Sequence, residues 1–370
     1  MRSEDRIMNP HSNEDRPFRA PRGEEFCDDA RSGQSGAAPH ASAKESSRRL
    51  TAEDLAPLTR IVSWRSAAAV LQTWLVIGVT IAIALACWSW PLALAAVVII
   101  ATQQHALFIL SHDAAHYRLF EHRGINDLIG RLCAAAPGLS MCTYRVIHRL
   151  HHNHLYGPQD PDIALHGGYP RGTWYLVRKL LKDLSGMTAA KTYAYFFGNP
   201  AKSIAADGPL NPLANTSIRL RVQARSDQRL VIALQLALPA LMLGLGGWRA
   251  LSLYLVLWVL PALTVLQAIL RLRAVCEHGA VADVSSPLTA ARTHVPGLSI
   301  AWLVARAVLF PHHVNYHIEH HLYPAVPHYH LKRLHALLAS RGMLQRAEVL
   351  PIGATMQKVF ANAAPSRVEP

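Results

Sequence analysis

Residues 67–87 read AAAVLQTWLVIGVTIAIALAC and contain no charged side chain. About 20 apolar residues are enough for a helix to cross the hydrocarbon core of a membrane, so this run predicts a membrane span. A second apolar run at 91–112 follows after a turn that leaves room only for a helical hairpin. Two further runs, 230–246 and 251–270, are joined by a few residues around Gly247. The sequence therefore predicts an all-α integral membrane fold with four transmembrane helices in two hairpins.

The composition and the placement of basic residues agree with this prediction. Hydrophobic residues make up 51% of the chain and charged residues only 16%, which is apolar for a soluble protein of this length. Of the arginines beside the spans, only Arg249 falls on the far side of the membrane. Because basic segments stay in the cytoplasm, we expect both termini and a helical cap there, at a bacterial-type inner membrane. This placement explains the net charge of +13 without nucleic acid as a partner.

The chain divides into a membrane domain and two polar ends. Residues 1–50 have almost no apolar periodicity and are expected to form a disordered tail. They lack the charged start and apolar core of a signal peptide. Residues 51–350 form the predicted membrane domain, and residues 351–370 form a C-terminal tail. The five cysteines contain no CxxC pair, so the sequence indicates neither a disulfide framework nor a thiolate metal site.

Most of the chain's 21 histidines fall in three short clusters. The clusters are HDAAH at 112–116, HRLHH at 148–152 and HIEHH at 317–321. Residues three or four positions apart share one face of a helix, so the outer imidazoles of each cluster can reach one metal ion. The eight histidines are His112, His116, His148, His151, His152, His317, His320 and His321. We expect them to converge on a binuclear metal site in the cytoplasmic cap.

The ligand type does not by itself identify the metal. Eight imidazoles are too many for a single zinc ion, which needs three or four ligands. The HExxH motif of zinc proteases is absent, as is the Glu-x-x-His pattern of carboxylate-bridged di-iron bundles. Imidazole suits iron, copper, zinc and nickel alike. A metal transporter is an alternative class, but its ligands would lie near mid-bilayer, where the predicted spans place only His105.

Three longer motifs point to a known family. HDAAH, HRLHHNHLYGPQDPD at 148–162 and NYHIEHHLYPAVPHYHLKRLH at 315–335 resemble the membrane fatty acid desaturase and hydroxylase family. The resemblance covers about residues 60–345. It implies two iron ions, O2 as co-substrate, and desaturation of a fatty acyl chain linked to a lipid, to CoA or to a carrier. Hydroxylation, ketolation or acetylenation, or a carotenoid, sphingolipid or specialised metabolite as substrate, are alternatives that the sequence leaves open.

The resemblance also bears on residues and partners outside the clusters. It suggests His278, shortly after the fourth span, as a ninth ligand, although a helix-end histidine bonded to a carbonyl is the alternative. His313 and Asn315 lie near the third cluster and are not assigned. A separate electron donor such as a ferredoxin is implied, because the chain has no flavin or dinucleotide motif.

Acidic neighbours should orient the imidazoles by accepting their second N–H. The candidates are Asp113, Asp160, Asp162 and Glu319. The remaining histidines of these regions are expected at the surface or the membrane interface: His154, His166, His312, His328, His330 and His335.

Overall fold

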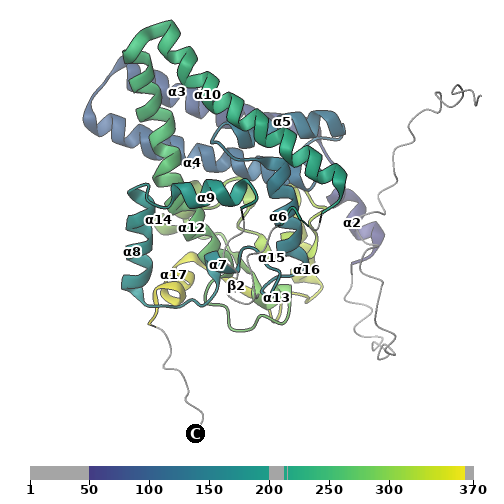
Figure 1. The fold of residues 1–370 in the computed structure, drawn as a ribbon. Helices are drawn as coiled ribbons and strands as arrows, with labels where there is room; N and C mark the ends of the chain where they lie inside the picture. The colour runs from purple at the N-terminus through teal and green to yellow at the C-terminus, as the bar shows by residue number, and fades with distance from the viewer. Residues whose placement is uncertain (1–49, 200–211, 215, 363–370) are drawn as a thin grey trace, which may run out of the picture. The chain divides into compact units, whose positions relative to one another are not determined.

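The computed structural model describes residues 50–199, 212–214 and 216–362, which are mostly helical (Figure 1). The expected N-terminal tail lies outside these residues except for Leu50. Three helical stretches are long and apolar enough to cross a membrane. They are α3 (Ser63–Ala86), α4 (Trp90–Ala115) and the continuous stretch Ile218–His278.

Helices α3 and α4 pack against each other. Helix α3 ends at Cys87, and Pro91 lies in the first turn of α4, where its missing N–H leaves no hydrogen bond unmade. The two helices differ in environment, because 22% of the apolar window of α3 is buried against 67% for α4. Helix α4 is therefore central to the fold, whereas α3 turns apolar side chains such as Leu71 and Leu75 outward.

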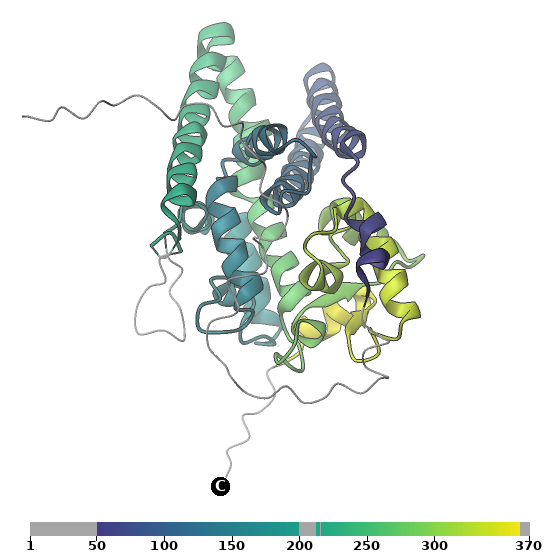
Figure 2. The ribbon, with the colours of Figure 1, turned by 90° about the vertical axis from the view of Figure 1, so that its right-hand side faces the viewer.

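The third stretch folds back on itself. It comprises α10 (Ile218–Tyr254), the π-helix η2 (Leu255–Val259), α11 (Leu260–Leu263) and α12 (Val265–His278). Gly246 and Gly247 leave helical geometry, and Gly247 has φ of 60°, which glycine adopts without strain. The chain reverses at these glycines, where the sequence predicts a turn, so the two arms of this stretch run in opposite directions (Figure 2).

Shorter helices gather at the ends of α4 and α12. Helices α5 and α6 pack against α4, while α7, α8 and α17 pack against α12. The shorter helices are α2 (Ala52–Thr59), α5 (Arg123–Ala135), α6 (Met141–Asn153), α7 (Ile163–His166), α8 (Thr173–Leu184), α9 (Ala189–Phe196), α13 (Pro287–Ala290), α14 (Ile300–Val308), η3 (Pro311–His313), α15 (His317–Leu322), η4 (His328–His330), α16 (Leu331–Ser340) and α17 (Ile352–Phe360). We call α5–α9 and α13–α17 the cap.

A small sheet departs from the all-α prediction. Strands β1 (Arg292–His294) and β2 (Glu348–Leu350) pair in parallel, with Thr293 opposite Val349. Arg292 is fully buried and donates hydrogen bonds to the carbonyls of Cys276 and Gly279 at the end of α12. Since Arg292 also pairs with Glu348, the sheet ties the end of α12 to the last part of the chain.

The expected C-terminal tail at 351–370 includes a packed helix. Helix α17 buries Ile352, Thr355 and Val359 against the cap and α12. Residues 363–370 lie outside the described residues. The membrane domain expected at 51–350 is thus continuous with folded structure as far as Phe360.

The contact between α4 and α5 depends on a glycine. A Cβ placed on Gly130 would meet the Cβ of Ala114 and, at 2.6 Å, the sulfur of Met141. We expect Gly130→Ala to destabilise the fold by about 1–3 kcal/mol, because overpacking outweighs the gain of about 1 kcal/mol in helix propensity. Thermal unfolding in detergent measures this. Gly78→Ala is the matched control, since a Cβ there meets nothing within 4 Å, and equal stability of the two variants would contradict the prediction.

Candidate metal centre

The first histidine cluster lies at the end of the central helix. His112 is in the last turn of α4 and His116 is its C-cap, and their ring centroids are 5.0 Å apart. Between them, Asp113 accepts hydrogen bonds from the backbone N–H and the Nδ1–H of His328. These bonds fasten the end of α4 to η4 and so fix the direction of both imidazoles.

Helix α6 carries the second cluster and is anchored by a buried carboxylate. Asp227 of α10 is fully buried and accepts hydrogen bonds from the Ser140 hydroxyl and the Cys142 N–H at the start of α6. Arg131 of α5 completes the cluster with an ion pair to Asp227 at 2.7 Å. The start of α6 is thereby fixed against two other helices, and its C-terminal half presents His148, His151 and His152.

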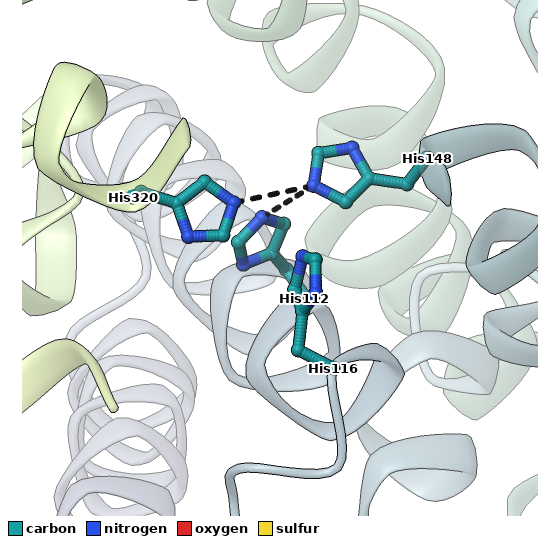
Figure 3. Close-up of side chains that lie close together, drawn as sticks. All are labelled: His112, His116, His148 and His320. Carbon is teal, nitrogen blue, oxygen red and sulfur yellow. Dashed lines mark hydrogen bonds between the residues drawn. The ribbon is translucent and has the colours of Figure 1, made fainter. Parts of the chain in front are cut away.

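Four histidines from three elements form the first group. His112, His116, His148 and His320 bring their ligating nitrogens within 4.8 Å of one another (Figure 3). The Nε2 of His148 lies 2.9 Å from that of His112 and 3.4 Å from that of His320. His152 adjoins this group, because its Nε2 is 2.9 Å from the Nε2 atoms of both His148 and His320.

A second group forms beside the first. It contains His151, His278, His317 and His321, all buried, with their ligating nitrogens within 4.8 Å of one another. The Nε2 of His278 lies 2.7 Å from that of His317 and 3.3 Å from that of His151. The structure therefore brings His278, from the end of α12, into a group with members of the second and third clusters.

Hydrogen bonds on the outer ring nitrogens determine what these groups can bind. The Nδ1 atoms of His151 and His278 face Asp160 Oδ1 at 2.9 Å and the Ala290 carbonyl at 3.0 Å. An imidazole that donates from Nδ1 in its neutral form has a lone pair on Nε2. The Nε2 lone pairs of the group then face one another, and a buried cation would convert this repulsion into coordination.

The distances and protonation states of the groups fit metal ions. Metal–imidazole bonds of about 2.0–2.1 Å place two nitrogens on one ion about 3.0–3.4 Å apart, close to the separations observed. Burial and the neighbouring imidazoles hold the pKa values of His148, His152 and His320 well below the usual value. Their rings are therefore neutral at physiological pH, the form in which histidine binds a metal.

His151 has a different electrostatic environment. Burial lowers its pKa, but the carboxylates of Asp162 and Asp160 outweigh that effect and raise it overall. The Asp162 carboxylate lies 3.6 Å from His151 Nδ1. A carboxylate on the outer nitrogen makes the imidazole a stronger ligand, so His151 is suited to bind a metal through Nε2.

The acidic residues expected to support the clusters have several partners. Asp160 contacts a cluster histidine directly, as described, whereas Asp113 bonds mainly to His328 and lies 3.7 Å from His112 Nδ1. Glu319 is fully buried and accepts hydrogen bonds from Thr293 and His335. Its role is to join α15 to β1 and α16.

Sequence reasoning missed several buried residues around the groups. His166, His328 and His330 are at most 5% exposed, whereas the sequence predicts them at the surface or the membrane interface. The spacing of these residues gave no signal, because their burial depends on packing between distant segments. Tyr144 was also missed: its hydroxyl lies 3.2 Å from His148 Nδ1, and its ring stacks on the His148 ring.

The unassigned residues near the third cluster lie outside both groups. The Asn315 side chain donates a hydrogen bond to the His294 carbonyl at 2.8 Å, a structural role. His313 is partly exposed and adopts φ of 61° in η3. His105, inside α4, is fully buried and faces the Val308 carbonyl rather than either group.

The protein combines long apolar helices with two buried groups of four histidines, which lie at the ends of α4 and α12. This combination is that of a membrane metalloprotein. The family description "Fatty acid desaturase" matches residues 88–347, and the chain belongs to this family.

Three characterised relatives carry desaturase names. The dihydrorhizobitoxine desaturase of Bradyrhizobium elkanii is 26% identical over 65% of this chain and 66% of the relative. The chloroplastic omega-3 fatty acid desaturase of Glycine max is 24% identical over 72% and 55%. The sn-1 oleoyl-lipid 12-desaturase of Anabaena variabilis is 22% identical over 66% and 69%. The chain thus spans between 55% and 69% of the length of these relatives.

The contact between Tyr144 and His148 gives one prediction. Tyr144→Phe keeps the stacked ring but removes the acceptor for the Nδ1–H of His148. Loss of such a partner typically costs about 10–100-fold in metal affinity, and we expect an effect of this size in competition with a chelator. Tyr193→Phe is the matched control, because its hydroxyl donates to the Pro137 carbonyl instead. Equal affinities of the two variants would refute the role of Tyr144.

Removal of metal should destabilise the protein. An ion that binds only the folded state contributes about 2.7 kcal/mol when its free concentration is 100 times Kd. We expect the melting temperature in detergent to fall after chelation and to return when Fe²⁺ is added back. The change should be followed by tryptophan fluorescence together with metal analysis. A melting temperature that stays constant while the metal is lost would show that the groups do not need an ion.

Proposed function

We propose that this protein catalyses O2-dependent desaturation of an acyl chain at a pair of histidine-bound iron ions. Overall, –CH2–CH2– plus O2, two electrons and two protons would give –CH=CH– and two water molecules. The observation that best supports this proposal is the pair of four-histidine groups within a chain of the fatty acid desaturase family. Family relatives named for the omega-3 and oleoyl-lipid 12 positions support a lipid or fatty acyl substrate.

In this proposal, the two groups are the two iron sites. One iron would be held by His112, His116, His148, His152 and His320, and the other by His151, His278, His317 and His321. Reduced iron with O2 supplies the oxidising power that an unactivated C–H bond requires, which no acid or base among the side chains can provide.

The protein's own residues would hold the ligands in place and exclude water. Asp160, Tyr144 and the Ala290 carbonyl accept the outer N–H groups and so fix the imidazole tautomers. Next to the first group, Phe108 packs edge-on against Tyr144 and Phe196 at 4.8 and 5.2 Å. This aromatic wall suits an alkyl chain and keeps bulk water from the reacting carbons.

For the membrane arrangement, we propose four spans in two hairpins with the cap in the cytoplasm. The reversal at Gly247 supports two antiparallel spans within residues 218–278, and apolar side chains such as Leu236, 68% exposed, and Leu245, 77% exposed, would contact lipid. The basic segments beside the spans support the orientation. The cap would then lie on the cytoplasmic face of a bacterial-type inner membrane.

Electrons would come from a separate protein. The net charge of +13 favours an acidic carrier such as a ferredoxin. Exposed cations on α8, including Arg178 and Lys182, offer a surface for it. The acyl chain itself would enter the site from the bilayer.

A specialised metabolite is the second candidate substrate. One relative is named for dihydrorhizobitoxine rather than for a fatty acid or a lipid. The same iron pair could oxidise such a compound, with hydroxylation in place of desaturation as a further outcome. Profiles of both lipids and small metabolites therefore distinguish the two candidates.

Replacing His320 tests the proposed function. We expect His320→Ala to abolish the change in lipid double bonds that the wild-type gene produces in cells under O2, and to lower the bound iron of the purified protein. The control is His154→Ala, since His154 ends the same helix as the second cluster but belongs to neither group. Full activity of His320→Ala would refute the ligand assignment, and an altered metabolite profile with unchanged lipids would favour the second candidate.

A further inference from the structure

A third cluster of possible metal ligands lies beside the second histidine group. The ligating atoms of His151, Asp160 and His166 lie within 4.8 Å of one another, and all three side chains are at most 2% exposed. His151 belongs to the second group through Nε2, which faces His278. Its Nδ1 points the other way, toward Asp160 and away from that contact.

His166 is the unexplained member of this cluster. It is 1% exposed, and neither of its ring nitrogens has a hydrogen-bond partner among the described residues. A buried polar atom without a partner costs about 1–3 kcal/mol, so a native protein normally supplies one. The Nε2 of His166 lies 3.7 Å from Asp160 Oδ2, which is too far for a direct hydrogen bond. Asp160 Oδ2 already accepts a hydrogen bond from the Tyr156 N–H, so a species bound between the two atoms would supply the partner that His166 lacks.

The charge of the cluster favours a cation as that species. Asp160 is fully buried, and in the described part of the chain its ion pairs are with His151 and His166 rather than with any lysine or arginine. A buried carboxylate usually needs a full positive charge nearby. Asp160 also accepts hydrogen bonds from the backbone N–H groups of Tyr156 and Asp162, but these carry no net charge, and neither does a neutral imidazole, whereas a divalent ion does.

The donor set indicates the class of ion. Two histidines and one carboxylate bind iron or zinc in many proteins. Two donors on one such ion lie about 3.0–3.6 Å apart, so the separation of His166 and Asp160 needs little adjustment. We propose that His151, Asp160 and His166 bind a third divalent transition-metal ion. When this ion binds, the Nδ1 proton of His151 is released to solvent, so His151 bridges to the second group as an imidazolate and Asp160 changes from a hydrogen-bond acceptor to a ligand. This site is additional to the proposed iron pair, and neither the histidine clusters nor the family match assigns His166.

The number of bound ions tests this proposal. Purified protein is loaded separately with Fe²⁺ and with Zn²⁺, dialysed, and analysed by mass spectrometry for metal per chain. We expect three ions per chain in the wild type and two in both His166→Phe and His166→Gln. Phe keeps the ring against Tyr156 and His278, while Gln keeps a polar side chain of similar length.

A matched control separates the site from general burial effects. His294 is fully buried, and neither of its ring nitrogens has a hydrogen-bond partner among the described residues. Its ring stacks on Phe310, and it belongs to none of the three clusters of possible metal ligands. His294→Phe should therefore retain three ions.

Other results overturn the third site in distinguishable ways. Two ions in the wild type and in both His166 variants would refute the third site and leave the proposed iron pair intact. Loss of more than one ion would make His166 part of the second group instead. A wild type that binds no metal would refute the proposed function as well.

Discussion

The repulsion between imidazole lone pairs that face one another inside the protein is the constraint on which the rest of the structure depends. In a medium of low dielectric constant, such an arrangement is stable only when the rings are held firmly and a cation can lie between them. The fold meets the first condition with four elements that converge from distant parts of the sequence. Helices α4, α6, α12 and α15 each contribute at least one histidine and are each fixed by buried polar contacts.

The two parts of helix α4 need different kinds of residue. The helix as a whole is long and apolar enough to cross a membrane, whereas its last turn carries His112 and Asp113 and its C-cap is His116. The change from apolar to ligating residues occurs at the C-terminal end of α4, beside α5 of the cap. Helix α4 is the most buried of the long apolar stretches, so the first histidine group lies at the end of a helix that is packed along most of its length.

The sequence predicts the parts of this protein that depend on local periodicity. Apolar runs and a spacing of three or four residues are properties of single helices, so the long helices and the eight clustered histidines could be found without a structure. His278 has no such spacing and came only from a family resemblance. His166 was misplaced because it ends a four-residue helix whose burial is decided by α12 and Tyr156.

Other elements escaped prediction for a related physical reason. Strands β1 and β2 have three residues each and are separated by more than fifty residues. Three residues are too few to show the alternation of apolar and polar side chains by which a strand is predicted. Helix α17 is stable because its apolar face packs on α12, not because of its own propensity. Long-range packing of this kind leaves no periodic trace in a single sequence.

The sheet between β1 and β2 has a consequence for the order in which the protein matures. The histidines of the two groups lie between residues 112 and 321 of the chain. Glu348, which forms an ion pair with Arg292, comes later in the sequence. During synthesis, the second group therefore cannot reach its final form until almost the whole chain has left the ribosome. A nascent chain halted before β2 would carry all the histidines of both groups without the ion pair between Arg292 and Glu348.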